Sequence, residues 1–181
     1  MRDLTEAMLE VHEILVGAGV VHALCGGIAA NLYREEIRAT TDVDFYIFVA
    51  ATQLVALTRQ FEEHGWKAKP FWHAHEQLRL QKKDTPRVDC LIASTDFEQA
   101  ALRRTLKAPI EGRSIPVLSP EDLIVFKLVA GRARDYEAVA AIVNTAGQKL
   151  DVRYIGDALD TLGMLDRWER ARTEAERERD E

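Results

Sequence analysis

Hydrophobic residues recur along the chain with two periods, one typical of helices and one typical of strands. The N-terminal part shows helical spacing over residues 4–16, a short apolar run over residues 21–25, and helical spacing again over residues 28–34. Gly17 and Gly19 predict the end of the first helix, and Gly26-Gly27 separates the apolar run from the second helix. The pattern therefore predicts a helix, then a buried strand, a glycine turn and another helix.

Residues 42–49 alternate as a half-buried strand does. Val43, Phe45, Ile47 and Val49 share one face, and the opposite face carries Asp42, Asp44, Tyr46 and Phe48. An amphipathic helix is predicted over residues 53–64, ending at Gly65. Further strands are predicted over residues 66–71, 77–82 and 87–92, and a second hairpin over residues 103–110 and 114–118.

The C-terminal third is predicted to be helical. Ser119 is an N-cap candidate, Pro120 suits the first helical position, and Asp122 stands in the capping-box position. Helices are predicted over residues 123–129, 135–144, 152–162 and from 165 onward. Strands first and helices last predict an α/β (α+β) fold, with a small mixed β-sheet flanked by helices. We expect residues 1–118 to form the core and residues 119–181 a helical region packed on it.

Composition places the chain among ordinary globular proteins, because 47% of its 181 residues are hydrophobic and 30% are charged. It shows neither the ~18-residue apolar run of a membrane helix nor a signal-peptide pattern, so we expect a cytoplasmic protein without membrane contact. Cys25 and Cys90 lie in apolar runs and are interpreted as buried thiols. The formal net charge of -6 argues against broad attraction to nucleic acid.

Asp42 and Asp44 are the main chemical clue. Residues two apart on a strand project from the same face, so both carboxylates reach one cation. Two like charges ~4 Å apart repel by roughly 4 kcal/mol at an effective dielectric near 20, which favours a bound cation. Mg²⁺, or Mn²⁺, is the natural ion, because it prefers oxygen ligands and binds carboxylates together with substrate phosphates. Asp89 lies in the apolar run 87–92, and we expect it to join the pair as a third metal ligand.

Structural alternatives stand beside these interpretations. Asp42 and Asp44 are also acceptable as acids at a strand entrance. Asp89 has Arg79 and Arg87 as candidate salt-bridge partners. Arg79, Lys82, Lys83 and Arg87 form a basic stretch around a predicted hairpin, typical of a solvated rim but also suited to steering RNA or a nucleotide beside a catalytic cleft. His73 and His75 are interpreted as exposed strand residues.

The order of three motifs resembles the nucleotidyltransferase superfamily that includes DNA polymerase β. The motifs are Leu24-Cys25-Gly26-Gly27, Arg38-x-Thr40-x-Asp42-Val43-Asp44 and Val88-Asp89. A later helix carries Lys127 and is followed by Asp135, which makes the chain most similar to the AbiEii or MenT-like bacterial toxins. The match covers roughly residues 20–145. Gly27 stands where many members of the superfamily have Ser.

The resemblance implies a nucleotidyltransferase fold and a metal-dependent enzyme. Catalysis and metal binding would rest on Asp42, Asp44 and Asp89, and nucleotide binding on Gly26, Gly27, Arg38, Thr40, Lys127 and Asp135. NMP would pass from an NTP to an acceptor hydroxyl of RNA, of a tRNA 3′ end or of a protein, and a type IV toxin would have a cognate antitoxin. The alternatives are an aminoglycoside nucleotidyltransferase, or a catalytically silent domain that binds a nucleotide, RNA or a partner protein.

Overall fold

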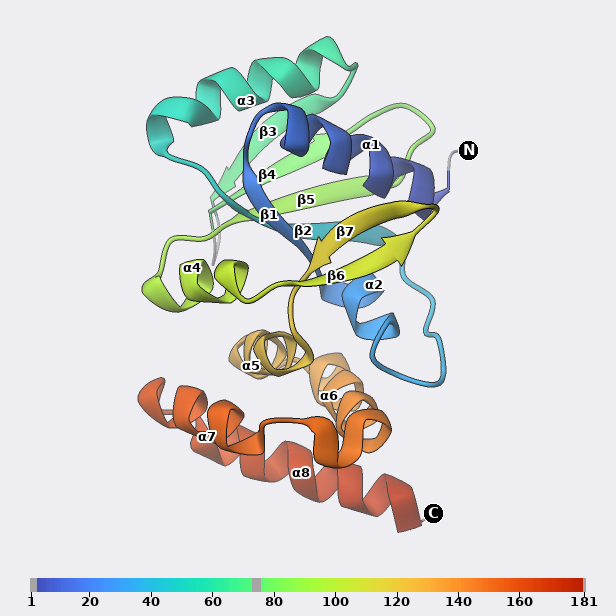
Figure 1. The fold of residues 1–181 in the computed structure, drawn as a ribbon, viewed down its shortest axis with the longest axis vertical. Coiled ribbons are helices and arrows are strands. Elements are labelled where there is room, and N and C mark those ends of the chain that lie inside the picture. Colours follow the sequence, from blue (N-terminus) through green and yellow to red (C-terminus); the bar gives the residue numbers. More distant parts are fainter. Residues whose placement is uncertain (1–2, 73–75, 181) are drawn as a thin grey trace. The chain divides into compact units, whose positions relative to one another are not determined.

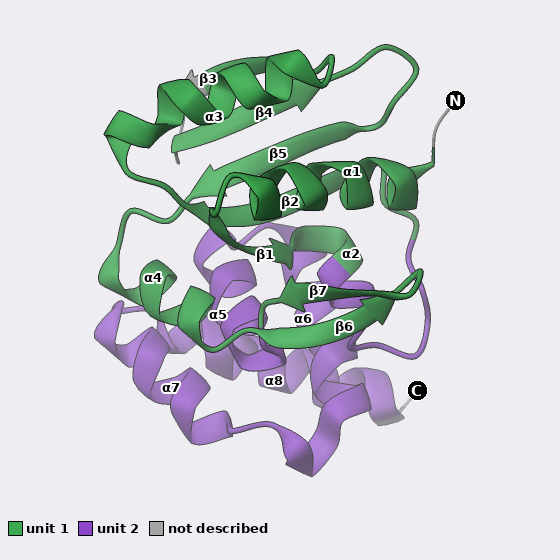
Figure 2. Cartoon of the chain, turned by 45° about the horizontal axis from the view of Figure 1, so that its top comes forward, with its two compact units in different colours: residues 1–28, 39–118 green, residues 29–38, 119–181 purple. Residues whose placement is uncertain are grey.

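The computed structural model describes residues 3–72 and 76–180. Its contacts divide the chain into two compact units. The first unit comprises residues 1–28 and 39–118, and the second comprises residues 29–38 and 119–181, coloured green and purple in Figure 2. Helix α2 (Gly26–Asn31) begins in the first unit and ends in the second.

A mixed seven-stranded sheet with the order β3-β4-β5-β2-β1-β7-β6 forms the first unit in the described part of the chain. The central pairs β2–β5 and β1–β7 are parallel, whereas β1–β2 and the hairpin pairs β3–β4, β4–β5 and β6–β7 are antiparallel. The strands are β1 (Val21–Cys25), β2 (Asp42–Phe48), β3 (Lys67–Trp72), β4 (Glu76–Gln81), β5 (Arg87–Ile92), β6 (Leu106–Ile110) and β7 (Arg113–Val117). The predicted mixed sheet flanked by helices is confirmed.

Helices cover both faces of this sheet. Helix α1 (Leu4–Gly17) packs on β2 and β5, and α3 (Ala51–Glu63) packs on β3 (Figure 1). The face under α1 is apolar, because Val43, Phe45 and Ile47 of β2 are completely buried. Asp42 and Asp44 alternate with these residues and therefore project from the opposite face, which we call the carboxylate face. Helix α4 (Asp96–Arg103) contacts β1 and β2, and its Glu98 accepts a hydrogen bond from Tyr46 on the carboxylate face.

The second unit is helical. It contains α5 (Pro120–Ala130), α6 (Ala133–Ala146), the 3₁₀ turn η1 (Gly147–Lys149), α7 (Val152–Thr161) and α8 (Leu165–Asp180). Ser119 caps α5 as predicted, since its Oγ accepts from the Asp122 N–H at 3.1 Å. Helix α6 packs on both α5 and α8. Residues 29–38 belong to this unit, and Asn31 closes their loop by bonding the backbone N–H and C=O of Arg38.

Most element boundaries differ by a few residues from the sequence-based expectation, and the largest differences concern helices α4 and α2. Residues 96–103 form α4, whereas the hydrophobic pattern predicts no element over residues 93–102 and a strand from residue 103. A capping box explains this helix, because Thr95 Oγ1 accepts from the Glu98 N–H at 3.2 Å and Glu98 accepts from the Thr95 N–H at 2.8 Å. Helix α2 begins at Gly26 and ends at Asn31, whereas the pattern predicts helical character over residues 28–34.

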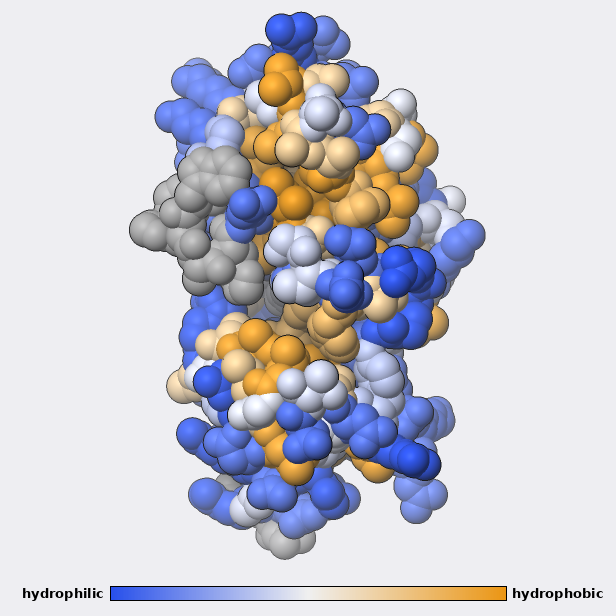
Figure 3. Space-filling view, turned by 90° about the vertical axis from the view of Figure 1, so that its left-hand side faces the viewer, coloured by the Kyte–Doolittle hydropathy of each residue, from blue (hydrophilic) through white to orange (hydrophobic). Residues whose placement is uncertain are grey.

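The surface is chemically mixed. The face drawn in Figure 3 shows hydrophobic residues gathered in patches between hydrophilic ones. The most exposed large apolar residues of the described chain lie on several different elements and loops; they are Ile37, Val55, Val16, Val152 and Val21. Among the described residues, no helix combines the length and the apolar character needed to cross a membrane.

Candidate active site on the carboxylate face

The turn between β1 and α2 lies directly against the second acid of β2. Gly26 has a left-handed backbone with φ of 66°, and a Cβ placed on it would lie 1.9 Å from Asp44 Oδ2. Cys25, the residue before it, is the register partner of Asp44. Only glycine fits this position without moving the Asp44 carboxylate.

The second glycine of the turn lies against Thr40. A Cβ on Gly27 would lie 2.8 Å from Thr40 Oγ1. The Thr40 hydroxyl in turn lies 3.4 Å from both Asp42 Oδ1 and the Asp42 carbonyl oxygen, so it donates weakly toward either. The structure thus brings Gly26, Gly27 and Thr40 together with both acids of β2.

Asp89 stands in register with Asp44, on the parallel neighbour β5. Its side chain is only 8% exposed and is held by two arginines. Arg79 donates from Nε to Asp89 Oδ1 at 2.8 Å and from a terminal nitrogen to Oδ2 at 3.3 Å. This bond to Asp89 raises the pKa of Arg79 above its ordinary value. The salt bridge named as the alternative for Asp89 is therefore present.

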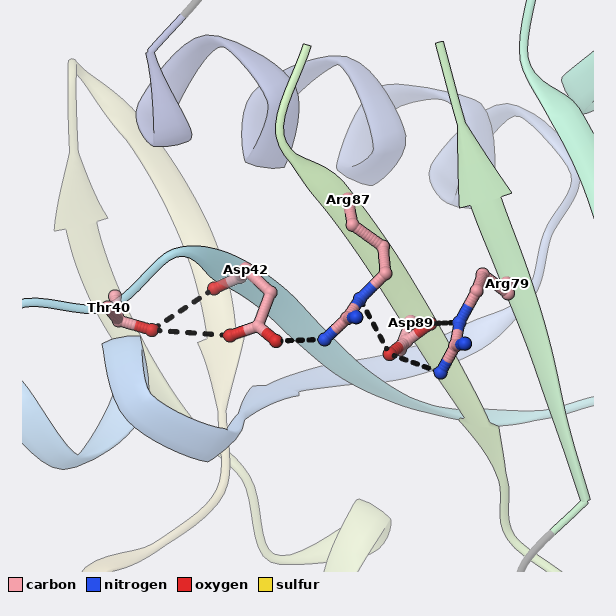
Figure 4. A network of polar contacts seen from close by, with 5 residues as sticks. All are labelled: Thr40, Asp42, Arg79, Arg87 and Asp89. Atoms are coloured by element: carbon pink, nitrogen blue, oxygen red, sulfur yellow. Dashed lines mark hydrogen bonds and ion pairs between the residues drawn. The ribbon is translucent and has the colours of Figure 1, made fainter. Parts of the chain in front are cut away.

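Arg87 connects the two strands (Figure 4). Its Nε lies 3.2 Å from Asp89 Oδ2, and a terminal nitrogen pairs with Asp42 Oδ2. The register explains this bridge, because Arg87 is the direct partner of Asp42. The sequence did not indicate the Arg87–Asp42 contact, since the register between β2 and β5 is not visible in either segment alone. A guanidinium therefore compensates two of the three candidate carboxylates.

The candidate residues could bind a divalent cation through two carboxylates, but they do not supply a complete set of protein ligands. Within residues 3–72 and 76–180, no three His, Cys, Asp or Glu side chains converge closely enough to hold a metal ion. Mg²⁺ nevertheless commonly takes one or two carboxylates and completes its shell with water and phosphate. Asp42 and Asp44 supply such a pair, and the missing Cβ atoms of Gly26 and Gly27 let the Asp44 carboxylate and the Thr40 hydroxyl lie directly against the turn. Asp89 is directed toward its arginines.

The remaining predicted nucleotide-binding residues lie in the second unit, and each has a partner there. Lys127 Nζ lies 3.7 Å from Asp135 Oδ1, and both side chains are nearly buried. Arg132 Nε donates to Asp135 Oδ2 at 2.6 Å. Arg38 is exposed and pairs with Glu137 of α6. The structure thus brings Lys127 and Asp135 together.

Both cysteines are buried thiols that form no disulfide bond. Burial raises the pKa of Cys90 strongly, and the charges of Asp89 and Asp44 add to this effect, so the thiol stays protonated at neutral pH. A protonated thiol is a poor metal ligand and nucleophile. Cys90 is therefore a structural residue under the carboxylates, and His73 and His75 lie outside the described residues.

Comparison with known proteins decides the family. Residues 4–164 match the model of a family described as nucleotidyl transferases of unknown function, DUF2204. The chain belongs to this nucleotidyltransferase family. It is thus a transferase enzyme, and no curated protein matches it significantly in sequence.

Solved structures agree with the fold of this nucleotidyltransferase. Antibiotic-resistance factor ANT(2″)-Ia, in complex with adenylyl-2″-tobramycin, is 16% identical with a TM-score of 0.59, over 87% of this chain and 97% of that one. The lincosamide antibiotic adenylyltransferase LnuA, bound to lincomycin, is 17% identical with a TM-score of 0.55, over 76% and 94%. Polyadenylate synthase of Megavirus is 14% identical with a TM-score of 0.51, over 80% and 32%. At these identities the similarity shows the fold.

Proposed function

We propose that this nucleotidyltransferase binds an NTP at Asp42 and Asp44 through Mg²⁺ or Mn²⁺ and transfers its NMP to an acceptor hydroxyl. The observation that supports this best is the contact between Gly26 and the Asp44 carboxylate, which places the backbone of the glycine turn directly against one of the two acids. A bound Mg²⁺ would neutralise phosphate charge and stabilise the leaving pyrophosphate. The glycine turn offers backbone N–H groups to the phosphates, because no Cβ blocks their approach.

Asp89 is proposed to accept the proton of the acceptor hydroxyl. The hydroxyl oxygen then forms a bond to the α-phosphorus, the bond from that phosphorus to the bridging oxygen breaks, and pyrophosphate leaves. Arg79 positions the Asp89 carboxylate with two hydrogen bonds. Arg87 forms ion pairs with both Asp89 and Asp42. Its ion pair with Asp42 would have to break when a metal–nucleotide complex binds to Asp42.

The proposed roles in the second unit follow from charge. Lys127 supplies an ammonium group for a phosphate, and Asp135 orients it from 3.7 Å. Arg38 and, in the first unit, Thr40 are proposed to contact the nucleotide. Division of the protein into a catalytic core at residues 1–118 and a C-terminal helical region at residues 119–181 is part of the same proposal.

The acceptor defines two candidate functions. The motif resemblance to AbiEii and MenT-like toxins supports RNA, a tRNA 3′ end or a protein as acceptor, with a toxin role in a type IV system and a cognate antitoxin. The shared fold with ANT(2″)-Ia and LnuA supports an antibiotic as acceptor instead.

A label-transfer assay tests the proposal. Each NTP, labelled on the α-phosphate or the γ-phosphate, is incubated with Mg²⁺, the protein and either cell extract or an aminoglycoside. Nucleotidyl transfer moves the α-label and never the γ-label, and nuclease or protease digestion then identifies the acceptor. Transfer of the γ-label would show phosphoryl transfer and contradict the proposal. Equal α-label transfer by the Asp42→Ala/Asp44→Ala variant would show that the site is wrong.

A further inference from the structure

The carboxylate face continues as a charged row across half of the sheet. The register pairs Asp44 of β2 with Asp89 of β5, Asp89 with Arg79 of β4, and Arg79 with Lys69 of the edge strand β3. Residues directly opposite one another in a sheet share a face. Three strand spacings of ~4.8 Å separate Lys69 from Asp44, which is ~14 Å in total. The row therefore runs from the proposed metal site outward into positive charge.

A neighbouring row on the same face has a similar composition. Arg87 is the partner of Asp42, and Lys67 is the partner of Gln81. Lys67 and Lys69 are both exposed, and neither side chain has a hydrogen bond or ion pair within the described part of the chain. Arg79 and Arg87 keep 27% and 42% of their side chains exposed. Strands β3, β4 and β5 thus present four cationic side chains on the face that carries the acids, and two of them, Arg79 and Arg87, are already paired with Asp89 and Asp42.

The two lysines also line a shallow hollow. Its volume is about 400 Å³, and it is lined by Glu62, Gly65, Trp66, Lys67, Ala68 and Lys69. Trp66 is only 1% exposed, so the hollow offers no aromatic platform on which a base could stack. Its charged groups are the two ammonium groups and the Glu62 carboxylate, so its net positive charge suits a phosphate better than a nucleobase.

We propose that Lys67 and Lys69, continued by Arg79 and Arg87, bind the phosphodiester backbone of a single-stranded polynucleotide acceptor. This inference rests on the proposed function, because it assigns the acceptor to the same site. A polyanion gains favourable contacts along the row, whereas a cationic aminoglycoside meets like charges there. The net charge of -6 does not oppose this. Each phosphate interacts mainly with protein charges within about one Debye length, which is ~8–10 Å near physiological salt.

Edge protection is the competing explanation for these lysines. Lysine and proline on an edge strand discourage pairing with another chain, and β3 carries both. The opposite edge strand β6 carries Lys107 and Pro109 and provides a matched control. Substitution by glutamate keeps a charge at the edge but repels phosphate. A Lys67→Glu/Lys69→Glu variant therefore separates the two explanations.

Fluorescence anisotropy with a labelled single-stranded RNA oligonucleotide tests the inference directly, over a range of salt concentrations. We expect Lys67→Glu/Lys69→Glu to bind at least about tenfold more weakly than wild type, and its negative slope of log K against log salt to be shallower by ~1.4. Lys107→Glu should bind like wild type. Equal binding by wild type and Lys67→Glu/Lys69→Glu would overturn the inference, as would tighter binding of an aminoglycoside than of RNA.

The outcome is separable from that of the proposed function. Asp44→Asn is expected to retain RNA binding and to lose label transfer. If the lysine variant loses RNA binding but wild type transfers no label from any NTP, the assignment of Lys67 and Lys69 to RNA binding is supported and the proposed transferase function is contradicted. If label reaches RNA equally in wild type and the lysine variant, the transferase function stands and the assignment of this surface is wrong.

Discussion

Asp44 and Asp89 are direct register partners on parallel strands, yet their carboxylates have different surroundings. Asp44 Oδ2 lies where a Cβ of residue 26 would be, against the α-carbon of Gly26. Asp89 is 8% exposed and accepts two hydrogen bonds from Arg79. The proposed division of labour follows from this difference: Asp44, against the glycine turn, binds the metal–nucleotide complex, and Asp89 is held in place by arginines.

Removing Arg79 is expected to destabilise the protein more than removing Arg87. Arg79→Ala leaves a nearly buried carboxylate without its best-aligned donor, at a cost of about 2 kcal/mol. Arg87 is 42% exposed, so Arg87→Ala should cost only about 0–1 kcal/mol. Urea unfolding of both variants measures these costs. A larger loss for Arg87→Ala would contradict the assignment of Arg79 as the main support of Asp89.

The Arg87 bridge gives a second expectation. Arg87→Ala removes a cation that competes for Asp42, so the variant should bind Mg²⁺ with a nucleotide analogue more tightly than wild type. Arg113→Ala is a suitable control, because Arg113 pairs with Glu13 away from the acids. Weaker Mg²⁺–nucleotide binding in Arg87→Ala would show that Arg87 contacts the substrate instead.

Gly26→Ala and Gly19→Ala form a matched pair. Both glycines have φ of 66°, so each substitution should cost about 1 kcal/mol of stability through backbone strain. A Cβ at Gly19 meets nothing within 4 Å, whereas a Cβ at Gly26 displaces the Asp44 carboxylate. We therefore expect only Gly26→Ala to lose Mg²⁺-dependent nucleotide binding. Equal binding by the two variants would refute the proposed role of the turn.

A buried histidine pair predicts the pH dependence of stability. His12 Nδ1 lies 2.8 Å from His22 Nε2, and His22 Nδ1 lies 2.7 Å from the Val20 carbonyl oxygen. A carbonyl oxygen only accepts, so His22 carries its proton on Nδ1, and His12 donates to the other nitrogen. The lowered pKa of each imidazole favours the neutral form of both at neutral pH. Burial is the main cause that lowers the pKa of each, with Glu13 and Arg113 acting on His12 in opposite directions.

Both pKa values are lowered in the folded protein, so the neutral histidine pair contributes its full stabilisation to the folded state above the ordinary histidine pKa of 6.5. It is lost as the pH falls below that value, since the unfolded chain takes up protons first. The free energy of unfolding should therefore decrease from about pH 7.5 to about pH 5.5. Urea titrations across this window measure it, with His64→Gln, at an exposed position, as a control. A flat or rising stability would contradict the neutral pair.

Local patterns predicted most of the elements. The alternation over residues 42–49 placed Asp42 and Asp44 on one face, and Ser119 marked the start of α5. Helix α4 was missed because its main sequence signal is the capping box of Thr95 and Glu98 rather than an apolar periodicity. The Glu98 carboxylate accepts hydrogen bonds from backbone N–H groups before the helix.

Long-range register lay beyond the sequence. That Arg87 stands opposite Asp42, and Lys69 in the same row as Asp44, depends on how β2, β5, β4 and β3 align. A shift of one residue in the pairing register of a strand would move each of its side chains to the other face of the sheet. The sequence of one strand alone does not determine its register with the next. Motif order grouped Asp42, Asp44 and Asp89, and that assignment stays a prediction, whereas the arginines that compensate Asp89 could only be named as candidates.

Calorimetric titration with Mg²⁺ and a non-hydrolysable NTP analogue tests the central claim most directly. Wild type should bind only when Mg²⁺ is present. Asp42→Asn and Asp44→Asn should each weaken binding by more than about 100-fold. This exceeds the effect typical of mutating a residue that only hydrogen-bonds to a metal ligand. Asp157→Asn, at an exposed position of α7, should bind like wild type. Equal affinity in wild type, Asp42→Asn and Asp44→Asn would contradict the account.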